Sequence, residues 1–177
     1  LIFPHGPIAM HKTLQPAAWA APKGYANGVA ARGTQVFVAG QIGWDGEGAF
    51  HSDDLVAQTR QALANIVAVL AEAGAAPQHI TRMTWYLTDK AEYKRRQREI
   101  GAVFREQIGH YTIAMTAVEV KGLIEDRAKV EIEVTAVVDW DGRAGSRLQG
   151  ACRDARPSAR RCGAARRRGH GLGRALR

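Results

Sequence analysis

Two stretches in the second half of the chain alternate strictly between apolar and charged residues. Val118-Glu119-Val120 and the run VEIEV at residues 130–134 each put apolar side chains on one face and carboxylates on the other. A period of two is typical of a strand that is buried on one side only. Residues 121–129 contain a glycine and several charges, and they are predicted to connect the two strands. The pattern alone leaves open whether Glu131 faces solvent or lies at a pocket.

Two longer segments have the period of an amphipathic helix. Residues 53–73 are predicted to be helical, with Ser52 or Asp53 as the N-cap and Gly74 at the end. Residues 90–108 form a second predicted helix, which Gly109 terminates. The apolar positions that define them are Leu55, Ala62, Leu63, Ile66, Leu70 and Ala73 in the first helix and Tyr93, Ile100, Val103, Phe104 and Ile108 in the second.

The remaining periodic runs predict strands. Residues 28–33 and 35–40 are expected to form a hairpin through Arg32-Gly33-Thr34, whereas residues 11–24, rich in Pro and Ala, are expected to be irregular. Further strands are predicted at residues 80–87, 111–120 and 130–138. The resulting order, ββαβαββ, favours an α+β fold in which two helices pack on one face of a mixed sheet.

The charge is distributed unevenly. The chain has 177 residues and a net charge of +8. Residues 140–177 carry eleven Arg, no Lys and two Asp, a net charge of +9 that leaves −1 for residues 1–139. We therefore expect three parts: an N-terminal extension, 1–14, partly disordered or vector-derived; one domain, 15–138; and an Arg-rich tail, 139–177, that is disordered because it has too few apolar residues to bury. The tail either binds nucleic acid non-specifically through phosphates or has no selected role.

Several classes of chemistry have little support. Both cysteines, Cys152 and Cys162, lie in the tail, which excludes a disulfide framework or a Cys-based zinc site in the domain and fits a reducing cytoplasm. The histidines are scattered, so no metal site is expected, and only His110, just before a strand, is a candidate for a site. The Gly-rich loop at residues 40–48 lacks the lysine of a phosphate-binding loop. No apolar run approaches the roughly 20 residues of a membrane span.

Four segments, taken together, resemble the RidA (YjgF/YER057c/UK114) family over about residues 15–138. They are GYANGV at 24–29, VFVAGQI at 36–42, the helix QTRQALANI at 58–66 with LAEAG at 70–74, and the strand pair VEV at 118–120 and VEIE at 130–133. The resemblance implies a chorismate-mutase-like fold and a homotrimer with a cleft between subunits. It also implies a cofactor-free activity: hydrolysis of a reactive enamine or imine to a carbonyl compound and ammonia.

The resemblance also implies a set of site residues. Glu131 corresponds to the family's water-positioning glutamate and is the catalytic candidate. The substrate-binding candidates are the residues that occupy the family's cleft positions: Tyr25, Tyr93, Gln97, Met115, Ala39 and Gly40. Within the basic run at residues 94–98, which otherwise reads as a solvated helix face, Gln97 is therefore the exception.

Met115 is the main departure from the family pattern, because the family places there an Arg that clamps the substrate carboxylate. Charge-assisted hydrogen bonds contribute on the order of 1.5–3 kcal/mol each, so a substrate other than a simple 2-imino acid is expected. Replacement cations that the sequence offers are Arg32, Arg82, Lys121 and Arg127. Two other functions stay open: a non-catalytic trimer that binds a small molecule, and, with less support, a protein that cleaves or binds RNA.

Overall fold

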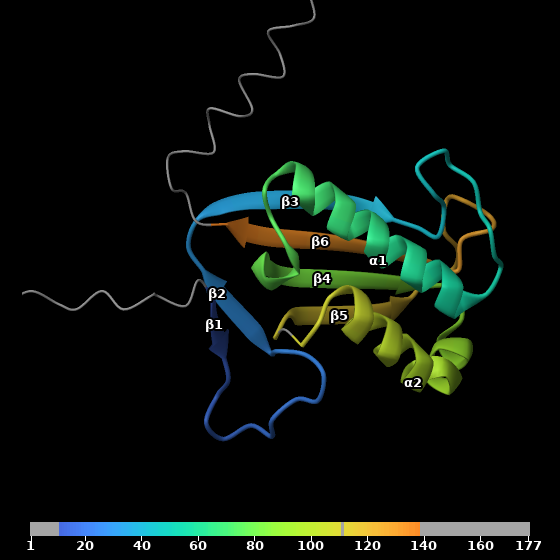
Figure 1. Cartoon of the computed structure of the whole chain (residues 1–177). Helices are drawn as coiled ribbons and strands as arrows, with labels where there is room; N and C mark the ends of the chain where they lie inside the picture. The colour runs from blue at the N-terminus through green and yellow to red at the C-terminus, as the bar shows by residue number, and fades with distance from the viewer. Residues whose placement is uncertain (1–10, 111, 139–177) are drawn as a thin grey trace, which may run out of the picture. The chain divides into compact units, whose positions relative to one another are not determined.

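The computed structural model describes residues 11–110 and 112–138, which form a four-stranded sheet, two helices and a small two-stranded sheet (Figure 1). The main sheet has the order β3-β6-β4-β5, with β3 at Thr34–Gln41, β6 at Val130–Val138, β4 at Ile80–Leu87 and β5 at Ala114–Glu119. The expected tail, the cysteines and the first ten residues lie outside the described residues.

The sheet is mixed, as predicted. β6 runs antiparallel to both of its neighbours, β3 and β4, while β4 and β5 are parallel. The parallel pair is joined through α2 (Lys90–Gln107), since parallel neighbours need a crossover connection. α1 (Leu55–Glu72) and α2 cover the same face of the sheet (Figure 1). The α+β fold class with two helices on one face is thereby confirmed.

The predicted hairpin between residues 28–33 and 35–40 is wrong. β2 (Gly28–Ala31) pairs instead with β1 (His11–Leu14) in the separate small sheet, while β3 pairs with β6. β1 also takes up the first four residues of the segment 11–24 that was expected to be irregular, while residues 15–24 form no strand or helix. The chain changes sheet at Gly33, which has a φ of +148° and lies so close to Val138 that an added Cβ would be 2.9 Å from its carbonyl carbon. A glycine is required at this close approach.

The helix boundaries differ from the prediction by one or two residues. α1 begins at Leu55 because Asp54, and not Ser52 or Asp53, is the cap: its Oδ1 accepts a hydrogen bond of 2.9 Å from the backbone N–H of Ala57. Gly74 ends α1 with a φ of +65°. β5 is shorter than predicted, starting at Ala114, and Tyr111 lies outside the described residues.

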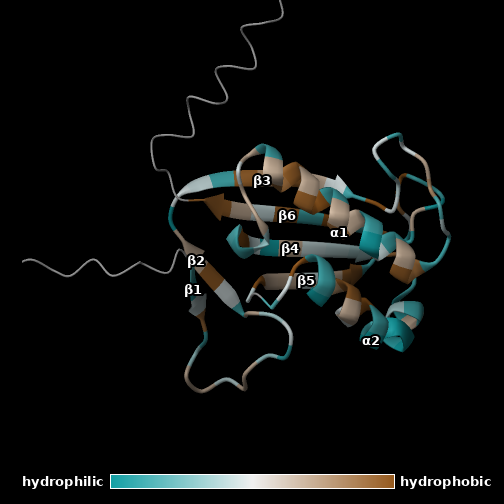
Figure 2. Cartoon of the chain, in the orientation of Figure 1, coloured by the Kyte–Doolittle hydropathy of each residue, from teal (hydrophilic) through white to brown (hydrophobic). Residues whose placement is uncertain are grey.

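The core lies between the helices and one face of the sheet. The apolar stripes of α1 and α2 meet the inward residues of β4 and β6, and Figure 2 shows brown segments on α1, on β3 and at the end of β6. Buried members of this core include Leu55, Leu63, Ile66, Leu70, Ile100, Val103, Met83, Trp85, Val130, Ile132 and Val134. None of the helices in the described part of the chain is long and apolar enough to cross a membrane.

Two polar residues of α1 hold the loops around the sheet edge. Gln58 is buried, and its Nε2 donates to the carbonyls of Ser52 and Arg127 at 3.0 and 2.9 Å, while its Oε1 accepts from Lys129 N at 2.8 Å. Asn65 donates through Nδ2 to the carbonyl of Trp44 at 2.8 Å. Gln58 and Asn65 both belong to the helix motif that carried the resemblance. Their role is structural, since they satisfy backbone groups of two irregular segments.

Candidate functional site

An open cavity of about 790 Å³ lies between α2, the start of β5 and the segment that precedes β2. Its volume is in the range of small-molecule sites. Four of the predicted site residues line it: Tyr25, Tyr93, Gln97 and Met115. Other residues that face it and enter the argument below are Lys23, Trp85, Ile100, Gly101, Phe104, Arg105 and His110.

Tyr93 and Gln97 are neighbours on one face of α2. They are four residues apart, which puts both side chains on the same helix face. Burial raises the pKa of the Tyr93 hydroxyl, and a hydrogen bond with Gln97 partly offsets that rise. The Tyr93 hydroxyl therefore stays protonated and polar at neutral pH at the edge of the cavity.

Tyr25 reaches the cavity because its neighbour is fixed to the sheet. The backbone N–H of Ala26 donates to the carbonyl of Ile113 at 2.8 Å, and Ala26 forms a parallel bridge with Ala114. This bridge places Ala26 beside the first residue of β5 and positions the Lys23–Tyr25 turn over the cavity.

Met115 forms part of an apolar wall. It pairs in register with Met83, whose side chain is buried, so Met115 points to the helix face of the sheet and packs against the core. Trp85 lies beside it in the wall, with ring centroids 6.3 Å from Tyr93 and 6.5 Å from Phe104. The buried Nε1 of Trp85 has no hydrogen-bond partner among the described residues.

Glu131, Ala39 and Gly40 lie on the opposite face of the sheet. Glu131 pairs with Tyr86, out of phase with the Met83–Val134 pair that faces the core. Its carboxylate lies against the Cα of Gly40, where the β3–β6 register shifts. The predicted site residues thus form two groups, and the cavity that contains Met115 does not include Glu131.

The face that carries Glu131 lies opposite the one that α1 and α2 cover (Figure 1). It holds a second hollow of about 390 Å³, lined by Phe37, Ala39, Arg82, Thr84 and Glu133 among others. Phe37 is 72% exposed, which is unusual for an aromatic residue in the middle of a strand. Burial and the neighbouring Glu133 raise the pKa of the Tyr86 hydroxyl on this face.

The cations beside Met115 are not the ones that the sequence suggested. Arg32, Arg82, Lys121 and Arg127, the candidates that the sequence left open, do not line the cavity within the described part of one chain. Arg82 pairs with Glu133 at 3.8 Å on the far face, and Arg127 binds Asp53 at 2.8 Å. Lys23, Arg105 and His110 take their place. A signal for Arg105 was available: residues 93, 97, 101 and 105 follow one i, i+4 ridge of α2.

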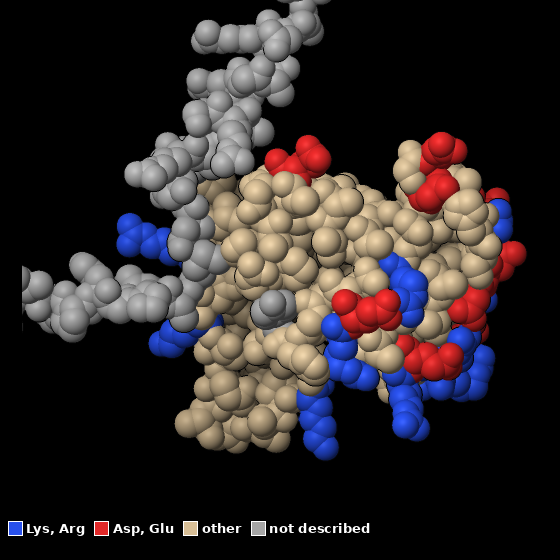
Figure 3. All heavy atoms as spheres, in the orientation of Figure 1, with Lys and Arg blue, Asp and Glu red and all other residues tan. Residues whose placement is uncertain are grey.

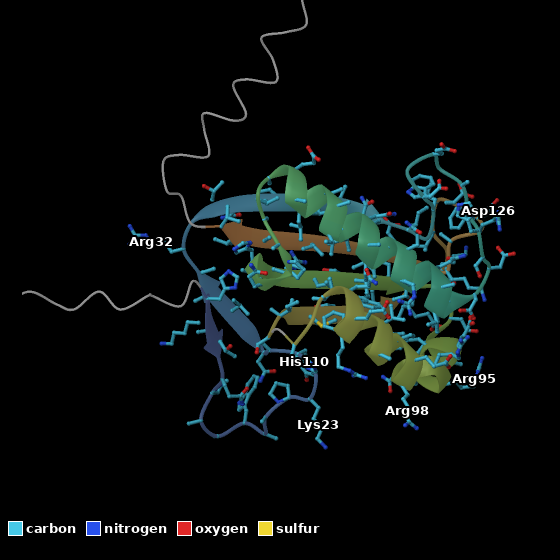
Figure 4. All side chains as sticks on the ribbon, in the orientation of Figure 1. Lys23, Arg32, Arg95, Arg98, His110 and Asp126 are labelled. Atoms are coloured by element: carbon cyan, nitrogen blue, oxygen red, sulfur yellow. The ribbon has the colours of Figure 1, made fainter. Side chains whose placement is uncertain are left out.

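Charged side chains gather along one edge of the molecule. Figure 3 shows basic side chains along the edge of the molecule that α2 forms, interleaved with acidic ones. Figure 4 shows Lys23 and His110 on that same edge and Arg32 at the other end of the sheet. Within residues 11–110 and 112–138, no group of three or more His, Cys, Asp and Glu side chains could hold a metal ion.

The fold is an α+β arrangement in which the candidate site residues form two groups, one on each face of the sheet. The family model described as "Endoribonuclease L-PSP" matches residues 15–138. The chain belongs to this family, and the resemblance to RidA proteins is confirmed, because solved members of the YjgF/YER057c/UK114 and Rid families match as well.

Individual relatives are similar over most of their length. A RutC family protein from Pyrococcus abyssi is 37% identical over 106 residues, which is 59% of this chain and 78% of the relative. The Rid family protein YyfB from Yersinia pestis has a TM-score of 0.66 at 27% identity and covers 73% of this chain and 99% of its own. E. coli TdcF with bound serine has a TM-score of 0.53 at 29% identity, covering 72% and 99%.

Proposed function

We propose that this protein hydrolyses a reactive enamine or imine to a carbonyl compound and ammonia, with Glu131 as the catalytic group and a substrate other than a simple 2-imino acid. The observation that carries the proposal is the state of Glu131. Its carboxylate has no hydrogen-bond or ion-pair partner among the described residues, whereas Glu133, two residues further along the same face, is engaged by Arg82 and Tyr86. A carboxylate without a partner is free to accept a hydrogen bond from water.

The chemistry requires one base and one water molecule. Glu131 accepts a proton from the water as its oxygen bonds to the carbon of the C=N group, and the proton returns to the nitrogen. The hydroxyl proton of the resulting carbinolamine then moves to the nitrogen as the C–N bond breaks, so that ammonia leaves and a C=O group remains. The atoms balance as imine plus water to carbonyl compound plus ammonia, so the reaction needs neither an oxidant nor a reductant.

Both half-sites serve one ligand only if copies of the chain assemble. We propose a homotrimer in which the face bearing Glu131 and Phe37 packs against a neighbouring copy, so that Glu131 of one subunit approaches the cavity of the next. The exposed Phe37 and the separation of Glu131 from Met115 across the sheet support this arrangement. The relative TdcF is described with bound serine, which supports a small ligand derived from an amino acid.

The test measures the release of keto acid from imines generated in situ, one small (2-iminopropanoate) and one with a benzyl side chain. Under the proposal the protein accelerates hydrolysis of the bulky imine, Glu131→Gln abolishes the acceleration, and Glu72→Gln, at an exposed helix position, leaves it intact. If no imine is accelerated while a ligand still binds equally to the unmodified protein and Glu131→Gln, the chain is a non-catalytic binding trimer and the hydrolysis is refuted.

A further inference from the structure

The large cavity has two chemically different sides. Its apolar side is formed by Met115, Trp85, Ile100 and Phe104, of which Trp85 and Ile100 are buried. The polar side carries Lys23, Arg105 and His110. No Asp or Glu is among the described residues that line the cavity, so its positive charge is not neutralised from within the wall.

Arg105 is placed to use that charge. Its guanidinium folds back along α2 over Gly101, where Nη1 would lie 3.4 Å from an added Cβ. A side chain at Gly101 would compete for this space, and its absence lets the guanidinium lie along the ridge that also carries Gln97 and Tyr93. Arg105 belongs to the last turn of α2, where a cation also interacts favourably with the free carbonyls of the helix end.

Arg105 has no carboxylate partner in the described part of the chain, whereas two arginines nearby do. Arg96 on the same helix binds both Asp54 and Glu99, and Arg60 of α1 binds Glu106. Both Arg105 and Lys23 face the cavity without an ion pair. An unpaired guanidinium at a cavity is suited to a carboxylate, because its planar fork can donate two parallel hydrogen bonds.

We infer that Arg105, assisted by Lys23, binds the carboxylate of the substrate, and that the apolar body of the substrate packs against Met115, Trp85 and Phe104. The substrate class is then an imine or enamine of an amino acid with a large apolar side chain. The inference rests on the proposed function for the nature of the reacting group. The family pattern has its carboxylate-binding Arg at position 115. In this chain the wall at Met115 is apolar and adaptable, and the substrate carboxylate binds on the opposite side of the cavity.

The experiment measures binding of unreactive probes to the full chain by titration calorimetry. The probes are 3-phenylpropanoate, its uncharged analogue 3-phenylpropanamide, and propanoate, which keeps the charge and lacks the ring. We expect 3-phenylpropanoate to bind at least about 10-fold more tightly than either of the others. Arg105→Gln should weaken it by about 10- to 100-fold, as loss of a charge-assisted hydrogen bond does. It should also abolish the preference for the acid over the amide.

Arg98→Gln is the matched control, since Arg98 is an exposed arginine of α2 that does not line the cavity (Figure 4). It should change the affinity less than about twofold. Equal binding of acid and amide, no binding of the acid at millimolar concentration, or an equal loss in both variants would overturn the inference. Turnover separates it from the proposed function: Arg105-dependent binding without imine hydrolysis refutes only the reaction, and Glu131-dependent hydrolysis that ignores Arg105→Gln refutes only the inference.

Discussion

The carboxylate of Glu131 lies directly against the bare Cα of Gly40. An alanine Cβ at Gly40 would be 2.6 Å from the Cδ atom of Glu131, far inside van der Waals contact. The atoms closest to that Cβ belong to the carboxyl end of the Glu131 side chain, which can move aside while the backbone stays in place. Gly40 therefore fixes where the Glu131 carboxylate lies, because any other residue at this position would displace the carboxylate.

Gly40→Ala should lower hydrolytic activity about 100-fold, since it displaces the base while the fold is retained. Initial rates of keto acid release, with circular dichroism to verify folding, provide the measurement. Gly46→Ala is the control, because nothing lies within 4 Å of a Cβ at Gly46. Full activity in Gly40→Ala would show that the Glu131 position does not matter for turnover.

Met115→Arg should change substrate preference towards small imino acids. The new guanidinium would introduce a charge in the apolar wall, improving kcat/KM for 2-iminopropanoate by about 10-fold or more and lowering it for an imine with a benzyl side chain. Met115→Leu separates charge from shape and should leave the preference for the bulky substrate unchanged. An identical response to Leu and Arg would contradict this explanation.

Asp54→Ala should destabilise the fold by about 1–2 kcal/mol, mostly through loss of the α1 cap. Its carboxylate also bonds Arg96 of α2 at 2.7 Å, but 42% exposure of the Asp54 side chain limits that contribution. The hydrogen bond from the Arg96 guanidinium, more than the one from the backbone N–H of Ala57, holds the pKa of Asp54 below its ordinary value. Urea unfolding measures the effect, and Asp53→Ala, at a more exposed carboxylate, should cost less.

Asp45 should make the stability of the fold depend on pH in the acidic range. Hydrogen bonds from the backbone N–H of Ala49, from the His51 ring and from the N–H of Glu47 lower its pKa from 3.8 to about 2. A depressed pKa stabilises the fold above the ordinary value, and this contribution is lost as the pH falls from about 4 through 2. The thermal midpoint of Asp45→Asn should therefore fall less between pH 5 and 2 than that of the unmodified protein. Glu47→Gln serves as the control; parallel curves for all three would refute the assignment.

Phe37→Lys should weaken the proposed trimer. Burying a charge where an aromatic side chain packs costs several kcal/mol at an interface, so light scattering should show smaller species at micromolar concentration. Val69→Lys, at an exposed apolar position of α1, on the helix side of the sheet and away from Phe37, should leave the assembly unchanged. An unmodified protein that is monomeric would remove the basis of the shared site.

The strands and helices with strong periodicity were predictable from the sequence. The bounds of β4 and β6 match the prediction because both are runs of β-forming residues, and β6 also buries alternate side chains along most of its length. β1 was missed because it is short and mostly exposed, so it has no apolar alternation. The predicted partner of β2 was wrong because the turn residues at Arg32-Gly33 are equally compatible with a hairpin and with a change of sheet.

The site was predictable only in part. Tyr25, Tyr93, Gln97 and Met115 come together as the family pattern implied. The opposite orientation of Glu131 depends on the register between β4, β5 and β6, which no local pattern encodes. Arg105 was missed because α2 is rich in charged residues, and the run at residues 94–98 reads as a solvated helix face. Only its position on the i, i+4 ridge through Gly101 shows that Arg105 lines the cavity.

The division of the site between the two faces of the sheet has a genetic consequence. In the proposed trimer each cleft takes Glu131 from one chain and the cavity from another. Two inactive variants with defects in opposite halves, such as Glu131→Gln and a cavity variant, would then complement each other when their subunits exchange. Random mixing in equal amounts would leave about one cleft in four with both halves intact, so a mixture of two dead proteins would recover activity that neither has alone.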